Sequence, residues 1–216
     1  MRVITPPGVY APQGDTELLV ETLAAEDLRP GSRSLDLCTG TGVVAIEAAR
    51  RGLDATAVDV SRTAVATAWL NARLNACQVR LRRGDLGEPV ARERFDLVTA
   101  NPPYVPAEDP CPPAHGLRRA WDAGPDGRLL LDRICSQAPA LLTRTGVLLL
   151  VQSSLSGVAA SLDGLRRAGL QAEVVGRRTQ AFGPVMRARA DWFEASGLVP
   201  TGLRTEELLV IRATPT

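Results

Sequence analysis

The chain has 216 residues, a formal net charge of +1, and 45% hydrophobic and 23% charged residues. This composition is ordinary for a globular protein, and the length suits one α/β domain or at most two. A net charge near zero gives no field that would attract nucleic acid or an anionic membrane. All 25 basic residues are arginine, which excludes a Walker lysine and a Schiff-base lysine.

The sequence favours a cytoplasmic protein. Its four cysteines are too far apart for a C-x-x-C pair, so we expect reduced thiols and no metal site. The first residues contain no apolar signal segment. The longest clean apolar run, Val147–Val151, is too short to cross a bilayer, so no membrane contact is expected.

Short apolar strands alternate with helices along the chain. After an irregular Pro- and Gly-rich lead-in, Asp15 is the expected N-cap of a helix that runs to about Leu28. Further helices are predicted at residues 43–51, 62–75 with Ser61 as cap, 128–142 and 157–168. Strands are predicted at 34–38, 55–59, 79–82, 95–100, 146–152, 171–178 and 206–213. This alternation predicts an α/β fold with a doubly wound sheet, parallel in its first five strands.

The segment 181–200, between the last two predicted strands, is too long for a simple connection. An amphipathic helix is expected in it from Pro184 to about Ser196, with Gly197 as its C-cap. We interpret the whole chain, residues 1–216, as a single domain. Residues 1–30 then form an N-terminal approach and helix, and 181–200 an insertion.

The most distinctive stretch is Asn101-Pro102-Pro103-Tyr104, directly after the fourth predicted strand. Two prolines end the strand and lack N–H groups, so the amide oxygen of Asn101 and the carbonyl of Pro102 can act as acceptors. Each can take one N–H of a flat NH2 group, while the Tyr104 ring stacks on its plane. A turn with a capping Asn is the simpler interpretation of the same tetrapeptide.

Polar residues also follow the three preceding strands. Asp36, Asp59 and Asp85 stand at the ends of strands one to three, as Asn101 does for the fourth. Ligands of a doubly wound sheet bind outside the carboxyl ends of its strands, so these four residues predict one crevice. Solvated loop acids are the alternative, which is common for one aspartate but less so for a set.

Two cofactors compete for this crevice. The turn Gly40–Ala45 matches the G-x-G-x-x-A pattern of dinucleotide sites, with Asp59 near the distance of a ribose-binding acid. A carboxylate at Asp36 would repel a pyrophosphate bound there. S-adenosylmethionine is cationic and free of phosphate, and it fits better. Asp36 would neighbour its methionine end, Asp59 its ribose hydroxyls, and Asp85 with the Leu86 N–H its adenine.

These motifs resemble class I S-adenosylmethionine-dependent methyltransferases, and more narrowly the HemK group of glutamine N5-methyltransferases that act on peptide chain release factors. The resemblance covers nearly the whole chain. It rests on Val9–Thr16, Leu35–Gly42 and Asn101–Tyr104, and continues through Ala114–Leu117 and Trp121–Arg128. It implies a Rossmann-like sheet of seven strands, mostly parallel with an antiparallel last strand, and S-adenosylmethionine as cofactor.

The resemblance also implies roles for single residues. Cofactor contacts are implied at Thr16, Asp36, Cys38, Gly40, Asp59, Asp85, Leu86 and Asn101. Catalytic roles are implied for Asn101, Pro102 and Tyr104, with Pro103 completing the substrate-binding tetrapeptide. Cys38 replaces the first glycine of the family's loop, which is expected to tighten the cofactor pocket. His115, the only histidine, is expected to be structural, because this reaction needs no base within reach.

The expected partners follow from the same resemblance. No counterpart is expected of the N-terminal helical domain by which bacterial members hold the release factor, so the resemblance implies the short archaeal and eukaryotic branch. That branch works with a small zinc-binding activator subunit. Three alternatives stay open: a DNA adenine methyltransferase, a small-metabolite methyltransferase with 181–200 as a lid, and a non-catalytic cofactor-binding module. The low net charge disfavours nucleic acid.

Overall fold

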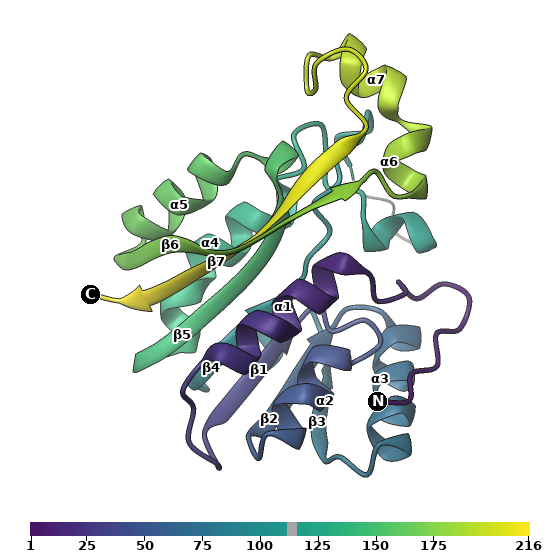
Figure 1. Cartoon of the computed structure of the whole chain (residues 1–216). Coiled ribbons are helices and arrows are strands. Elements are labelled where there is room, and N and C mark those ends of the chain that lie inside the picture. The colour runs from purple at the N-terminus through teal and green to yellow at the C-terminus, as the bar shows by residue number, and fades with distance from the viewer. Residues whose placement is uncertain (112–115) are drawn as a thin grey trace.

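The computed structural model describes residues 1–111 and 116–216, and a seven-stranded sheet forms its centre (Figure 1). The strand order is β3-β2-β1-β4-β5-β7-β6. The strands are β1 (Arg33–Leu37), β2 (Asp54–Asp59), β3 (Val79–Arg83), β4 (Phe95–Ala100), β5 (Leu142–Ser153), β6 (Leu170–Ala181) and β7 (Thr205–Pro215). Pairs among β1 to β5 are parallel, whereas β7 is antiparallel to β5 and β6. The predicted fold class, with its antiparallel last strand, is confirmed.

Helices cover both faces of this sheet. One face carries α1 (Gly14–Ala25), α2 (Val43–Arg50) and α3 (Arg62–Leu74), and the other carries α4 (Leu129–Leu141) and α5 (Val158–Arg167) (Figure 1). The described residues also form three short 3-10 turns, which are η1 (Glu88–Val90), η2 (Leu117–Ala120) and η3 (Ser154–Ser156). Ser61 caps α3 as predicted, because its Oγ accepts the Ala64 N–H at 3.3 Å.

The prediction that Asp15 caps the first helix is wrong. The helix α1 begins at Gly14 with Gln13 in the N-cap position, so Asp15 lies inside the first turn. Its carboxylate turns inward instead of toward solvent, and the residue is only 3% exposed. Tertiary contacts therefore decide the orientation of this side chain, as the candidate site explains below.

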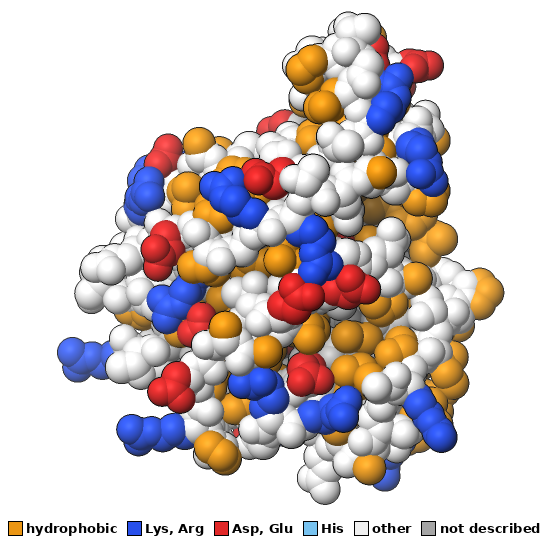
Figure 2. Space-filling model, viewed as in Figure 1, with side chains coloured by type: hydrophobic (Ala, Val, Ile, Leu, Met, Phe, Trp, Pro, Cys, Tyr) orange, Lys and Arg blue, Asp and Glu red, His pale blue; other side chains and the backbone are white. Residues whose placement is uncertain are grey.

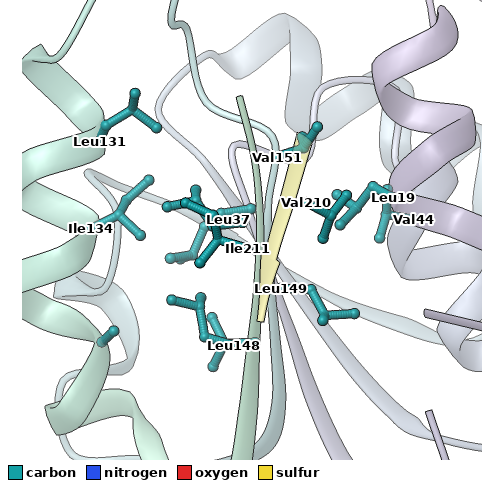
Figure 3. Packing of buried hydrophobic residues seen from close by; sticks show 14 of the residues in the cluster. Leu19, Leu37, Val44, Leu131, Ile134, Leu148, Leu149, Val151, Val210 and Ile211 are labelled. Atoms are coloured by element: carbon teal, nitrogen blue, oxygen red, sulfur yellow. The ribbon is translucent and has the colours of Figure 1, made fainter. Parts of the chain in front are cut away.

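Apolar side chains fill both sides of the sheet. Successive residues of a strand point to opposite faces. In β5, Leu148 points toward α4 and Ile134, whereas Leu149 points toward α1 and Leu19 (Figure 3). These four side chains are at most 1% exposed. A sheet buried on both faces is rigid, and its carboxyl edge is therefore a stable base for a site.

The segment between β6 and β7 folds as two short helices, where the sequence pattern predicts one. They are α6 (Pro184–Ala188) and α7 (Ala190–Ala195), separated at Arg189, and they project beyond the ends of β6 and β7 (Figure 1). Phe182 and Phe193 are buried and pack edge to face, with ring centroids 6.2 Å apart. Gly197 ends α7 as expected, with φ of 71°. Both rings belong to the same apolar cluster as the core of the sheet, so the segment is packed onto the domain.

The surface carries both signs of charge. On the face drawn in Figure 2, arginines and acidic side chains are interspersed over the helices and strands. No helix within residues 1–111 and 116–216 combines the length and apolar character needed to cross a bilayer.

Candidate active site

A cavity of about 800 Å³ lies at the edge of the sheet where the parallel strands end. Its walls include every residue that the sequence predicts for the site: Thr16, Asp36, Cys38, Gly40, Asp59, Asp85, Leu86, Asn101, Pro102, Pro103 and Tyr104. The volume is within the range of about 300–1,000 Å³ that is usual for ligand sites. Residues predicted separately, from four strand ends and the N-terminal stretch, therefore meet in one place.

Asp36 is a buried acid at the end of β1. Its Oδ2 accepts from the Thr39 hydroxyl at 2.6 Å, and its Oδ1 from the Thr99 hydroxyl at 2.8 Å. Burial raises the pKa of Asp36 to about 6, although both hydroxyls act in the opposite direction. A nearby cation would stabilise the ionised form, and a phosphate would destabilise it further. The site therefore suits a cationic ligand better than a dinucleotide.

Asp59 joins the end of β2 to the glycine turn. Its Oδ2 accepts the Gly40 N–H at 3.0 Å, and its Oδ1 accepts the Ser61 N–H at 2.9 Å. Gly42 has a φ of 83°, and a Cβ there would lie 2.8 Å from the Cβ of Ala68. Only glycine allows α3 to approach the turn this closely. Asp59 keeps lone pairs for a ligand, because a carboxylate has about four acceptor positions.

Cys38 adopts an unusual backbone conformation for a residue with a side chain. Its φ is 58°, in the left-handed region that favours glycine. Burial, and then the negative charges of Asp59 and Asp36, raise the pKa of the Cys38 thiol well above its ordinary value. A thiol held neutral in this way is a poor nucleophile, so Cys38 contributes to the wall of the cavity and not to bond making.

Asp85 already has a partner in this structure. Its Oδ2 lies 2.7 Å from Nη2 of Arg133 on α4, and both side chains are about two-fifths exposed. Leu86, which follows it, is buried with a φ of 47°. An adenine amine at Asp85 would therefore share the carboxylate with Arg133. No motif in the sequence marks Arg133, because it stands on a helix distant from the predicted loops.

The side chains of the tetrapeptide are held from two sides. The Nδ2 group of Asn101 donates to Thr16 Oγ1 at 3.3 Å, which turns Oδ1 away from Thr16. The Tyr104 hydroxyl donates to Asp15 Oδ2 at 3.0 Å, and the Tyr104 carbonyl accepts from Ser156 Oγ at 2.7 Å. Burial raises the pKa of Tyr104 well above its ordinary value, so the phenol stays protonated. Its hydroxyl is therefore a structural donor, and the ring remains for contact with a ligand.

The chain beyond the tetrapeptide folds back on it. The Val105 N–H donates to the Trp121 carbonyl at 2.8 Å, and the Val105 carbonyl accepts the Ala123 N–H at 3.1 Å. Gly127 has a φ of 72°, and a Cβ there would lie 2.3 Å from the Tyr104 carbonyl oxygen. Only glycine at position 127 allows the backbone to approach the Tyr104 carbonyl this closely. His115 and Ala114, which begin the predicted family-like stretch 114–117, lie outside the described residues.

Sequence reasoning missed a second polar group in the cavity. It comprises Asp15, Tyr10, Gln180 and Glu206, all of which line the wall. The Tyr10 hydroxyl donates to Asp15 Oδ2 at 3.2 Å, the oxygen that also accepts from Tyr104. An aspartate in a first helical turn is typical of helix ends, and a glutamate at a strand start is typical of surfaces. Neither position carries a sequence signal for burial.

The segment 181–200 also reaches the cavity, through Pro184, Val185 and Met186. Arg189 fastens it to the chain that follows the tetrapeptide. Its Nη1 donates to the Pro106 carbonyl at 2.9 Å, and its Nη2 pairs with Asp122. Asp122 is buried and also accepts from Arg118 at 2.9 Å. The insertion and the loop after the motif are therefore coupled.

Comparison with known proteins agrees with this geometry. The family model Methyltransferase small domain matches residues 1–110. The candidate protein N5-glutamine methyltransferase of Methanocaldococcus jannaschii is 34% identical over 181 residues, 83% of this chain and 90% of that protein. The release factor glutamine methyltransferase of Bordetella pertussis is 38% identical over 184 residues, 81% of this chain and 67% of that protein.

A solved structure has the same fold. A chain of the E. cuniculi Mtq2–Trm112 complex superposes with a TM-score of 0.66 at 22% identity, over 97% of this chain and 99% of that one. That complex is responsible for methylation of the eRF1 translation termination factor.

Proposed function

This chain belongs to the HemK-type S-adenosylmethionine-dependent protein glutamine N5-methyltransferases, and from that premise we propose that it methylates a glutamine side chain of a peptide chain release factor. The observation that carries the proposal is the position of Asn101 at the end of β4, beside the row of strand-end acids. That position puts an amide oxygen next to the space in which a cofactor would lie. The relatives that share most of this chain's length supply the substrate class.

The residues around the cavity fit the cofactor. Asp36, a buried acid with a raised pKa, would favour the ammonium end of the ligand, and Asp59 and Asp85 would accept from its ribose and adenine. Thr16, Cys38, Gly40 and Leu86 complete this proposed set of contacts. When bound, S-adenosylmethionine supplies an electrophilic methyl group on a sulfonium that leaves as a neutral thioether.

The protein's own contribution is to prepare a poor nucleophile. The lone pair of an amide nitrogen is delocalised, and it must be uncovered and aligned with the methyl group. Asn101 Oδ1 and the Pro102 carbonyl would each hold one N–H of the glutamine amide, with the Tyr104 ring against its plane. These oxygens also stabilise the positive charge that develops on nitrogen, and positioning lowers the barrier further. Water can take the proton that the nitrogen releases, because no strong base is required.

The partners are proposed on the same grounds. The solved neighbour is a two-protein complex, which supports a small activator subunit for this chain as well. A release factor acts on ribosomes, so we predict a cytoplasmic location. The net charge of +1 gives no support to a nucleic acid substrate.

The test uses methyl-labelled cofactor. The full chain is incubated with a release factor, or with its isolated Gly-Gly-Gln domain, in the presence and absence of a candidate activator subunit. Mass spectrometry should find one added methyl group on the glutamine and none on a version in which that glutamine is alanine. Transfer to duplex DNA without transfer to any release factor would overturn the proposal and favour the adenine alternative.

A further inference from the structure

Glu206 lies in the cavity wall near the start of β7, on the opposite side of Asn101 from the proposed cofactor acids. In the sheet, β4 and its Asn101 separate β1, β2 and β3, which lead to Asp36, Asp59 and Asp85, from β5 and β7. Because β7 runs antiparallel to β5, its first residues lie at the edge where the parallel strands end. Glu206 therefore belongs to the half of the cavity that would receive the methyl acceptor.

The carboxylate of Glu206 is only partly satisfied. Its Oε1 accepts from Gln180 Nε2 at 3.1 Å. Within the described part of the chain no donor meets its Oε2 in hydrogen-bond geometry, although the Ser153 hydroxyl lies close enough to lower the pKa of the carboxyl. Glu206 is 6% exposed, and Oε1 of its partner Gln180 lies so close to Gly14 that a Cβ there would come within 2.4 Å of it. A buried carboxylate oxygen without a donor is unfavourable. The arrangement favours a ligand that brings a donor.

The charges around Glu206 limit which group of a ligand could donate a hydrogen bond to it. Burial raises the pKa of Glu206, the side chains of Ser153 and Gln180 lower it, and the negative charge of Asp15 raises it again. Two acids in one wall disfavour an anionic group of the ligand. In the proposed reaction, Asn101 and Pro102 take both N–H bonds of the reacting amide. A further acceptor therefore needs a second donor from the same substrate, and an extended polypeptide always offers main-chain N–H groups.

We propose that Glu206 is a specificity-determining residue that accepts a hydrogen bond from a main-chain N–H of the polypeptide carrying the reacting glutamine. The inference rests on the proposed function for the identity of that polypeptide. It explains how this cavity can prefer a glutamine within a chain over a small amide, because the small amide has no main-chain N–H to offer.

Substitution of Glu206 tests the acceptor. In Glu206→Gln, the new amide oxygen stays toward Gln180 Nε2, so an NH2 group meets the substrate donor. Both Glu206→Gln and Glu206→Ala should raise KM for the Gly-Gly-Gln domain about 10- to 100-fold. Turnover at saturation and affinity for S-adenosylhomocysteine should stay within about threefold of wild type. Glu207→Gln is the matched control, because Glu207 points to the opposite face and pairs with Arg177 at 2.8 Å on the surface.

Modified peptides test the donor. A series of Gly-Gly-Gln peptides, each methylated on one main-chain nitrogen near the glutamine, is compared on wild type and Glu206→Ala. For one of these peptides, KM on wild type should rise by the same factor as Glu206→Ala causes with the unmodified peptide. On Glu206→Ala, the KM of that peptide should rise no further.

The outcomes separate the two proposals. Wild-type transfer to the glutamine, with KM unchanged in both Glu206 variants, would overturn the role of Glu206 alone. An equal penalty in Glu206→Ala on a small glutamine amide and on the domain would overturn the main-chain donor. Absence of transfer to the glutamine by wild type, with and without the activator, would overturn the proposed function and this inference with it. Thermal melting shows whether Glu206→Ala folds, and the nearly isosteric Glu206→Gln keeps the test valid if it does not.

Discussion

The Tyr104 hydroxyl donates to Asp15 across 3.0 Å, although the two residues stand 89 positions apart in the sequence. Asp15 Oδ1 also accepts the Thr16 N–H at 2.6 Å, and Thr16 Oγ1 in turn accepts from the Asn101 amide. One buried carboxylate therefore positions both the Tyr104 ring and, through Thr16, the Asn101 amide of the tetrapeptide.

Removal of this carboxylate should disturb catalysis at a distance. We expect Asp15→Ala to lower kcat about 10- to 100-fold, because small displacements of positioning groups have effects of this size. Glu17→Ala is the matched control, since Glu17 lies in the same helical turn but is exposed and pairs with Arg178. Steady-state kinetics on both variants decides the matter. A kcat for Asp15→Ala equal to that of the control would mean that Asp15 has no positioning role.

Asn101→Ala should have a larger effect on turnover than on binding. Loss of one preorganised contact in the transition state lowers kcat about 10²- to 10³-fold. Affinity for S-adenosylhomocysteine, measured by calorimetry, should change only a few-fold. Asn101→Asp should be milder on an amine acceptor yet still poor on the amide. Wild-type turnover in Asn101→Ala would exclude Asn101 from the chemistry.

Asp59→Ala should weaken binding of S-adenosylmethionine about 10- to 100-fold, through the loss of charged hydrogen bonds. The Gly40 N–H would lose its acceptor as well, so the glycine turn should loosen. Asp54 provides the control at the other end of β2, where it is half exposed and pairs with Arg80 at 3.1 Å. Calorimetry should show unchanged affinity for Asp54→Ala. Equal losses in the two variants would refute a specific ribose contact.

Cys38→Gly should stabilise the protein. A side chain in the left-handed region costs about 1–2 kcal/mol, and the greater freedom of glycine in the unfolded chain offsets part of the gain. Ala76→Gly is the matched control, because Ala76 also has a positive φ, 54°, but does not line the cavity. Chemical denaturation should show a similar gain for both, whereas only Cys38→Gly should alter cofactor affinity. Unchanged affinity would show that Cys38 does not shape the pocket.

Cofactor affinity should depend on pH through Asp36. Its pKa is raised to about 6, so the carboxylate is charged above that pH and neutral below it. Only the charged form attracts an ammonium, so affinity for S-adenosylhomocysteine should rise as pH increases through about 6. Asp36→Asn should remove most of this rise, and 5′-methylthioadenosine, which lacks the amino-acid end, should show less of it. A profile that is identical in wild type and variant would contradict the assignment.

The same titration has the opposite effect on the empty protein. The pKa of Asp36 in the folded protein lies above the ordinary value of an aspartate, 3.8, so ionisation of Asp36 lowers the free energy of unfolding as pH rises from about 4 to about 6. Asp36→Asn should therefore be more stable than wild type at pH 8, and should lose that advantage near pH 4. Thermal melts at the two pH values measure the difference.

Much of the sheet could be predicted because buried parallel strands are continuous apolar runs. The strand β4 has the predicted bounds, Phe95–Ala100, and the polar residues after β1 to β4 meet because parallel strands end at one edge. The assignment of residues 1–216 to a single domain stays a prediction, as do the roles of the individual site residues.

Other features depend on tertiary contacts that leave no local pattern. The burial of Asp15 follows from tyrosines at 10 and 104 that converge on it, and the partner of Asp85 comes from α4. The apolar spacing of the insertion continues through Arg189, but its guanidinium is drawn to Asp122 and the Pro106 carbonyl, and the helix breaks there. Such contacts join segments far apart in the chain.

The order of the strands divides the cavity wall between two portions of the polypeptide. The proposed cofactor side comes mainly from residues before 105, within the span matched by the family model, with Arg133 of α4 beside Asp85. The opposite side includes Gln180, residues 183–186 and Glu206. A protein built in this way can be redirected to a new acceptor by transplanting its C-terminal portion, with the methyl-donor machinery left intact. Asp15 is an N-terminal residue that lies in the wall with Glu206, so a transplant must preserve its hydrogen bond with Tyr104.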